Sequence, residues 1–223
     1  MARSTYLGHV KAATAGLWGI GLIVIVWEVW ARAAGINPIV MPRPSDIGID
    51  LVVNHAAYLP ALAQTVILSA FGVLLGMLLG TTIAVLTWLS RIVSGLLTPL
   101  SLIFASVPVV ALIPVLARIF GYDMRTVLAI VVIITFFPAF VFTTAGLRAL
   151  PAGSDDLFRV LGAGTFRRLW YLAIPSAVPE WAVALRLAAA NAILAAMLAE
   201  FLMGTSGLGY LFQAARSELD MVR

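Results

Sequence analysis

Long apolar runs separated by short polar segments organise this chain. A helix that crosses a bilayer needs about 20 mostly apolar residues, and the runs of suitable length are 13–34, 61–89, 92–119, 126–147 and 177–201. None of them alternates with the period of a barrel strand, and lipid-exposed backbone must satisfy its own hydrogen bonds. The pattern therefore predicts an all-α integral membrane protein with five transmembrane helices, forming one transmembrane domain over residues 1–223.

The composition supports the membrane class. Hydrophobic residues fill 62% of the 223 positions and charged residues only 11%, whereas soluble domains carry about 25% charged residues. The net charge of +4 is scattered between apolar runs, so we interpret the basic residues as membrane-flanking charges. The sequence has no cysteine, which excludes a disulfide framework and a thiolate metal site.

The segment "INPIVMPRPSDIGIDLVVNHAAYLP" separates the first two spans. Its prolines enforce extended backbone, and Ser45 can then cap a short helix with Asp46 in its first turn. We expect this helix to lie along the membrane interface over about residues 45–60. The preceding apolar run is longer than the core of a signal peptide, so we expect a retained first helix. We expect its N-terminus in the cytoplasm, an orientation that the arginine cluster of Arg159, Arg167 and Arg168 favours.

Glycines and prolines inside the spans bear on helix packing. Gly72, Gly76 and Gly80 recur every fourth residue and predict a groove where another helix approaches closely. The alternative is the ordinary glycine enrichment of membrane helices. The internal prolines predict bent helices that line a cavity, or else plain kinks. These prolines are Pro99, Pro108, Pro114 and Pro138.

The segment "SDDLFRVLGAGTFRRLWYLAIP" at 154–175 is the most polar one between two spans. Ser154 can cap a short helix whose first turn is acidic, and Gly162 is placed to end it. Thr165 can begin a second helix, which we expect Pro175 to interrupt. The basic residues of this segment favour the cytoplasmic side.

The short helix at 154–161 carries apolar residues along one face, so it could dock a soluble partner. The apolar residues are Leu157, Val160 and Leu161. We therefore expect a cytoplasmic coupling loop over about residues 152–170, with an ordinary surface loop as the alternative.

This segment resembles the cytoplasmic signature of the permease subunits of ATP-binding-cassette importers. That signature is Glu-Ala-Ala, three residues, Gly, nine residues, Ile, one residue, Leu-Pro. Gly162 stands at the glycine, Leu172 at the Ile position, and Ile174-Pro175 at the Leu-Pro. The Glu-Ala-Ala place reads Asp156-Leu157-Phe158, where the large Phe158 departs from the pattern.

The resemblance extends along nearly the whole chain. Similar stretches are "MPRPSDI", "QTVILSAFGVLLGMLLG", "TPLSLIFASVPVVALIPVLARIFG", "FFPAFVFTTAGLRALP" and "AEFLMGTSGLGYLFQAA". Together they look most like the nitrate, sulfonate and taurine branch, which also includes permeases for vitamin precursors. The resemblance implies a MetI-like fold that moves a small solute, anionic or vitamin-precursor-like, by alternating access. The family usually has a sixth span, which we expect to be missing from this sequence.

The resemblance also implies partners and a location. These are a second permease copy, ATP-binding-cassette ATPase subunits, an extracytoplasmic solute-binding protein and the lipid bilayer of a bacterial-type cytoplasmic membrane. The chain has no phosphate-binding loop and no metal-spaced His group. We therefore expect no catalytic residue, metal or cofactor in this chain, with ATP and Mg held by the ATPase. The predicted ATPase-coupling residues are Asp155, Asp156, Leu157, Phe158, Arg159, Gly162, Ala163 and Pro175.

Polar or kinking residues within or beside the spans are candidates for the translocation pathway. Arg186 could favour an anion in the pathway or extend to the membrane surface. Glu200 is an intramembrane carboxylate and so a functional candidate, but capping or pairing is an equal alternative. The predicted pathway residues are Gln64, Ser106, Pro108, Arg186, Asn191 and Glu200.

Two other functions are compatible with parts of the pattern. The scaffold subunit of an energy-coupling-factor vitamin transporter also docks ATPases, but through coupling motifs on two long helices, and only one docking loop occurs here. A membrane-embedded enzyme acting on lipid would need clustered polar residues at membrane depth, whereas the charges here lie mostly at span ends.

Overall fold

A computed structural model describes residues 2–105, 108–204 and 206–218. Side chains are described from Trp18 onward, except at positions 98, 100–105, 109 and 110. Within these ranges the chain is almost entirely helical and contains no strand, which confirms the all-α prediction. The helices are α1 (Ala2–Ala33), α2 (Pro44–Val53), α3 (His55–Leu89), α4 (Arg91–Ala105), α5 (Val109–Phe120), α6 (Met124–Arg148), α7 (Ser154–Val160), α8 (Thr165–Arg168), the π-helical turn η1 (Leu169–Ala173), α9 (Ile174–Met203) and α10 (Gly207–Glu218).

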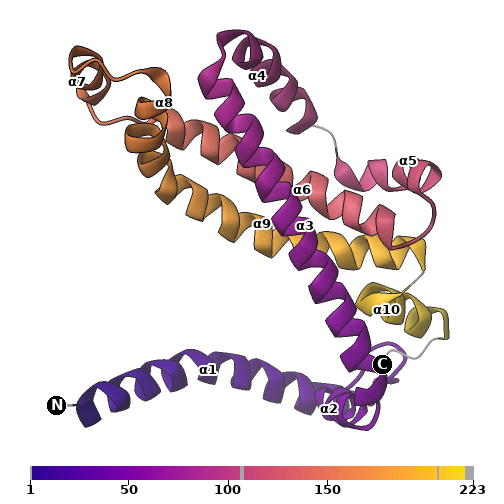
Figure 1. Cartoon of the computed structure of the whole chain (residues 1–223). Helices are drawn as coiled ribbons and strands as arrows, with labels where there is room; N and C mark the ends of the chain where they lie inside the picture. The colour runs from indigo at the N-terminus through magenta and orange to yellow at the C-terminus, as the bar shows by residue number, and fades with distance from the viewer. Residues whose placement is uncertain (1, 106–107, 205, 219–223) are drawn as a thin grey trace. The chain divides into compact units, whose positions relative to one another are not determined.

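Three helices in the described ranges are long and apolar enough to cross a membrane. They are α3, α6 and the continuous helix Thr165–Met203, which joins α8, η1 and α9 (Figure 1). The chain divides into two compact units. The N-terminal unit comprises Met1–Leu59 with Phe212–Arg223, and the central unit comprises Pro60–Leu211. The prediction of a single transmembrane domain stays a prediction.

In the N-terminal unit, Glu28 of α1 holds the start of α2. Its carboxylate accepts hydrogen bonds from the backbone N–H of Ser45 at 3.0 Å and from the Ser45 hydroxyl at 2.9 Å, and it pairs with Arg32. The prediction that Ser45 caps α2 was wrong, because the helix begins one residue earlier at Pro44, with Arg43 at the N-cap position. Proline suits the first helical position, since it has no N–H to satisfy there.

The predicted interfacial helix is shorter than expected. α2 ends at Val53, and α3 begins at His55. The side chain of Asp50 closes this junction by accepting hydrogen bonds from Asn54 and Tyr58. α2 buries none of its residues, which is compatible with a helix that rests on a membrane surface.

In the central unit, α3 crosses α6 at its three spaced glycines (Figure 1). A Cβ atom added at Gly76 would lie 2.8 Å from the carbonyl oxygen of Val132, and one added at Gly80 would lie 2.7 Å from that of Phe136. The Thr135 hydroxyl of α6 donates to the carbonyl oxygen of Gly72 at 3.0 Å across the same contact. The glycine face of α3 therefore permits close approach of the two backbones.

The second close contact in the central unit joins α6 to α9. A Cβ atom at Gly146 of α6 would lie 2.8 Å from the Cα atom of Ala177. α9 buries small side chains at helical spacing, which lets it pack closely along α6. These residues are Ala177, Ala184, Ala188, Ala192, Ala195, Ala196 and Ala199.

The predicted third span is two short helices. α4 has 15 residues and α5 has 12, so neither reaches the length needed to cross a bilayer. Pro108 stands at the N-cap of α5 with extended backbone (φ −64°, ψ 110°), so the helix starts anew there. The other predicted kink prolines, Pro99, Pro114 and Pro138, lie inside α4, α5 and α6. Ser106 lies outside the described residues.

The prediction that Pro175 interrupts its helix was wrong. The chain remains helical from Thr165 to Met203, because η1 widens the helix just before the proline. The N–H of Ile174 donates to the carbonyl oxygen of Leu169, five residues earlier. A wide turn of this kind accommodates a residue that lacks an N–H and whose ring crowds the preceding turn.

Candidate functional site

The predicted coupling loop contains a left-handed glycine at the start of its first helix. Gly153 (φ +74°) is the N-cap of α7, and no side chain caps this end of the helix. The Ser154 hydroxyl instead donates to the carbonyl oxygen of Pro151 at 2.6 Å. The prediction that Ser154 caps α7 was therefore wrong, because the helix starts at this residue and its side chain closes the preceding turn.

α7 ends at the glycine that the sequence singled out. Gly162 has φ +74°, and its N–H donates to the carbonyl oxygen of Arg159 at 3.0 Å. The N–H of Ala163 donates to the carbonyl oxygen of Phe158 at 2.9 Å. This pair of bonds is the Schellman motif, in which a left-handed glycine terminates the helix. α7 and α8 are thus separate short helices joined by a turn that contains Gly162.

α7 exposes an apolar surface. It buries none of its residues, and Val160 is 85% exposed and Leu161 72% exposed. Leu157 is also exposed on this helix, whereas Phe158 is half-buried. An apolar surface at the end of a charged loop is typical of a place where another protein binds.

Ion pairs surround the first turn of α7. Asp155 pairs with Arg159 at 3.0 Å within α7 and accepts a hydrogen bond at 2.7 Å from Nε of Arg168 in α8. Asp156 is exposed. Arg168 was absent from the predicted site residues, since 13 positions separate it from Asp155. The only signal in the sequence was opposite charge within one short loop.

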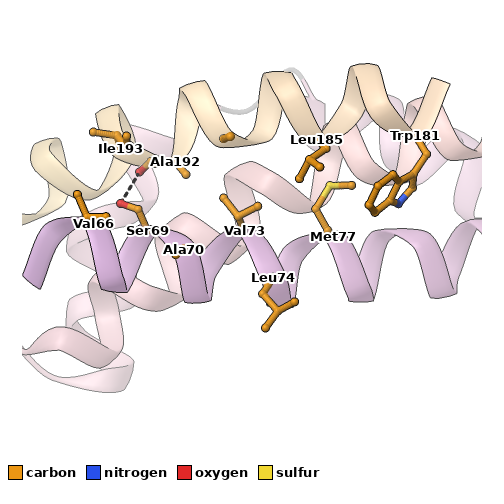
Figure 2. Close-up of a pocket in the computed structure, with 11 residues that line it drawn as sticks. Val66, Ser69, Ala70, Val73, Leu74, Met77, Trp181, Leu185, Ala192 and Ile193 are labelled. Carbon is orange, nitrogen blue, oxygen red and sulfur yellow. Dashed lines mark hydrogen bonds between the residues drawn. The ribbon is translucent and has the colours of Figure 1, made fainter. Parts of the chain in front are cut away.

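An apolar groove of about 450 Å³ lies between α3 and α9. Figure 2 shows Val73 and Met77 of α3 on the side that faces Leu185 and Trp181 of α9, with Val66 near Ile193 at the other end. Ser69 of α3 also lines the groove, and its hydroxyl donates to the carbonyl oxygen of Ala192 of α9 at 3.5 Å (Figure 2). At one end, Nε1 of Trp181 donates to the Thr81 hydroxyl at 3.0 Å.

None of the predicted pathway residues in the described ranges lines this groove. Arg186 and Asn191 are exposed on α9. Arg186 is two residues from both Ala184 and Ala188, so it lies on the opposite side of α9 from the buried alanines. Gln64 lies at the other end of α3, where its Nε2 donates to the Ser206 hydroxyl at 2.6 Å.

Glu200 is buried at the end of α9, with 2% of its surface exposed. Its carboxylate accepts hydrogen bonds from the Thr65 hydroxyl of α3 at 2.9 Å and from the backbone N–H of Gly209 at 3.1 Å. The Thr65 hydroxyl also accepts from the N–H of Leu208 at 3.0 Å. A Cβ atom at Gly207 would lie 2.2 Å from the carboxylate. The carboxylate therefore joins α3, α9 and the start of α10, which supports the structural alternative for Glu200.

We expect Glu200→Ala to lower the free energy of unfolding by about 3 kcal/mol, because the Thr65 hydroxyl and the Gly209 N–H both lose their buried acceptor. The loss of stability would be measured as a lower midpoint of thermal unfolding in detergent, with tryptophan fluorescence as the signal. The control is Asn191→Ala, an exposed change on the same helix. Equal midpoints for the two variants would contradict a structural role for the carboxylate.

Among the described residues, no three His, Asp or Glu side chains gather in a metal-binding arrangement. The candidate site consists of the exposed apolar residues of α7 and the helix that leads from α7, with an apolar groove along that helix.

The sequence profile of the binding-protein-dependent transport system inner membrane component matches residues 72–221, which include α7 and α9. The chain belongs to this family of transport permeases. This match confirms the resemblance to the permease subunits of ATP-binding-cassette importers and the MetI-like fold that it implied.

Several curated proteins are similar to this permease. The formylaminopyrimidine transport permease protein ThiX of Halalkalibacterium halodurans is 30% identical over 89% of this chain and 80% of its own length. A putative aliphatic sulfonates transport permease protein SsuC of Bacillus subtilis is 27% identical over 90% of this chain and 74% of its own. The taurine transport system permease protein TauC of Escherichia coli is 23% identical over 92% of this chain and 77% of its own length.

These relatives decide between the predicted functions. All three are named as transport permeases, so the permease belongs with importers of small solutes rather than with membrane enzymes. The energy-coupling-factor alternative is not favoured. The family description also places the permease in an inner membrane.

Proposed function

We propose that this permease works as a dimer that moves a small solute inward by alternating access, with ATP hydrolysed by partner subunits docked on α7. The observation that carries the proposal is the exposed apolar face of α7, a helix that ends at a glycine stop and is followed by a membrane-length helix. Because Thr165–Met203 is one continuous helix, a push on the docking surface can tilt the wall of the groove near Trp181.

We propose that α7 and the N-terminus face the cytoplasm. Arg159, Arg167 and Arg168 cluster in the coupling loop, and Arg3 and Lys11 precede the first apolar run. Positive residues of this kind favour the inner side of a membrane. The ATPase subunits, with their bound ATP and Mg, would then lie on the side where ATP is available.

The position of Arg186 supports a second permease copy. This side chain lies within a membrane-length helix, exposed and on the side away from the buried alanines. A charge at membrane depth seldom faces lipid, and it normally faces a protein partner or a water-filled path. We therefore propose that this side of α9 faces the dimer partner or the solute.

The solute that we propose is small and polar, either anionic or like a vitamin precursor. The similar permeases are named for formylaminopyrimidine, aliphatic sulfonates and taurine. An arginine beside the pathway would favour an anion. An extracytoplasmic binding protein would deliver the solute, as the family description of binding-protein dependence suggests.

Gly162→Asp tests the coupling loop. Asp cannot adopt φ +74° without strain on the order of 1 kcal/mol, so we expect the end of α7 to move and transport per ATP hydrolysed to fall. The matched control is Gly164→Asp, because Gly164 has an ordinary φ of −69° at the N-cap of α8, where Asp is favoured.

The measurement is solute uptake and ATP hydrolysis by the complex purified from its native membrane and reconstituted into vesicles. We expect the Gly162 variant to hydrolyse ATP with little uptake and the Gly164 variant to match the unmodified complex. Normal uptake by the Gly162 variant would contradict the docking role of the loop. A purified complex without any ATPase would contradict the proposed function as a whole.

A further inference from the structure

α7 has few attachments to the rest of the permease. It buries none of its residues, and no side chain caps its start. The turn that follows it contains Gly162 and Gly164, neither of which has another heavy atom near its Cβ position. A docking helix held only by glycine turns would bend at those turns when a partner pushes on it, and little of the push would reach the membrane.

One ion pair connects α7 to the long helix. Arg168 donates from Nε to Oδ1 of Asp155 at 2.7 Å, and its Nη2 contacts the same oxygen. The Arg168 side chain is 18% exposed. Hydrogen bonds between a guanidinium and a carboxylate are charge-assisted and therefore stronger than neutral hydrogen bonds. Since Arg168 is the last residue of α8, which continues through η1 into α9, the pair joins the docking helix directly to the membrane-length helix.

A second arginine on the same carboxylate provides a natural comparison. Arg159 pairs with Oδ2 of Asp155 at 3.0 Å, but both residues belong to α7, four positions apart. The Arg159 side chain is 61% exposed. This pair lies within one helix, so it cannot hold α7 against α8, and an exposed pair of this type stabilises a helix only weakly.

We propose that Arg168 is a positioning residue that, through Asp155, makes α7 and the helix Thr165–Met203 move as one rigid lever. This inference rests on the proposed function, because it assumes that a partner pushes on α7. It adds a residue outside the predicted coupling set, and it explains how a push on α7 could pass the turn that contains Gly162 and Gly164. Arg168 acts through Asp155 and need not touch the ATPase or the solute.

The structural part of the inference can be tested without any partner. The chain has no cysteine, so spin labels can be placed at introduced cysteines in exposed positions of α7 and α9, namely Val160→Cys and Val178→Cys. We expect one narrow distance distribution in lipid nanodiscs. Arg168→Gln should broaden it, whereas Arg159→Gln should not. A distribution that Arg168→Gln leaves narrow would overturn the inference.

The functional part uses the same two variants in the reconstituted complex. We expect Arg168→Gln to keep its ATPase subunits but to lower solute uptake per ATP about tenfold, the change that corresponds to one lost charge-assisted contact. Arg159→Gln should lower the ratio less than Arg168→Gln does, and Arg168→Lys should recover part of the loss by keeping the charge. Equal losses in the two Gln variants would overturn the inference, as would release of the ATPase by Arg168→Gln, which would make Arg168 a docking contact.

The two proposals fail in different ways. If the unmodified complex contained no ATPase, the proposed function would be wrong, while the spin-label distances would still decide whether Arg168 holds α7 in place. If the ATPase were present and the Arg168 and Arg159 variants behaved alike, the lever would be wrong and the proposed function would stand.

Discussion

Gly80→Ala is expected to disrupt the packing of α3 on α6 and to lower the free energy of unfolding by on the order of 3 kcal/mol, the upper end for an overpacked contact. The added Cβ atom would lie 2.7 Å from the carbonyl oxygen of Phe136 and 2.8 Å from the backbone nitrogen of Phe140. These are backbone atoms of α6, so they cannot move aside as a flexible side chain can. Relief requires the two helices to separate.

The matched control is Gly95→Ala, on α4. A Cβ atom at Gly95 would meet no other atom within 4 Å, and alanine favours the helix more than glycine does. We expect this variant to unfold at the same temperature as the unmodified chain, or slightly above it. Thermal unfolding in detergent and the yield of monodisperse protein would be measured for both. Similar behaviour of the two variants would contradict the close approach of α3 and α6.

Leu161→Asp is expected to release the ATPase from the permease. Leu161 is 72% exposed at the end of α7, so it has little to contribute to the stability of the free chain. In a docked complex the new carboxylate would lose its water without gaining a partner. Loss of a central interface contact costs about 2–4 kcal/mol, which weakens binding by roughly 30- to 1,000-fold.

Val40→Asp is the control for this change, since Val40 is equally apolar and 78% exposed but lies outside the coupling loop. Copurification of the ATPase from native membranes in mild detergent would be measured for both variants. We expect the ATPase to remain with the Val40 variant and to be lost from the Leu161 variant. Retention in both would contradict α7 as the docking surface.

The sequence predicted those features that depend on residue spacing or on glycine. The fourth span, expected over 126–147, is α6 at Met124–Arg148, because an apolar run bounded by charges leaves little choice of ends. The glycines at every fourth position of α3 face α6. The end of α7 at Gly162 also follows from the sequence, since few other residues adopt a left-handed conformation.

Other features depend on tertiary contacts that the sequence does not specify. Ser45 and Ser154 are both good helix caps by residue type, but the structure has one hydroxyl bound to Glu28 and the other to Pro151. Pro175 should have ended its helix, yet the wide turn at η1 accommodates it. Arg168 was missed because its partner lies 13 residues away, across a turn whose shape depends on Gly162.

The central claim, that α7 of this permease docks an ATPase, is tested most directly by cross-linking in native membranes. Because the chain lacks cysteine, a single cysteine in place of Val160 can carry a photoactivated cross-linker on the docking surface. Tyr122→Cys, an exposed position in the turn between α5 and α6, is the control. We predict that position 160 cross-links to a protein with nucleotide-binding motifs, identified by mass spectrometry, and that position 122 does not. Cross-linking of position 160 to lipid alone, with no such protein captured, would contradict the account.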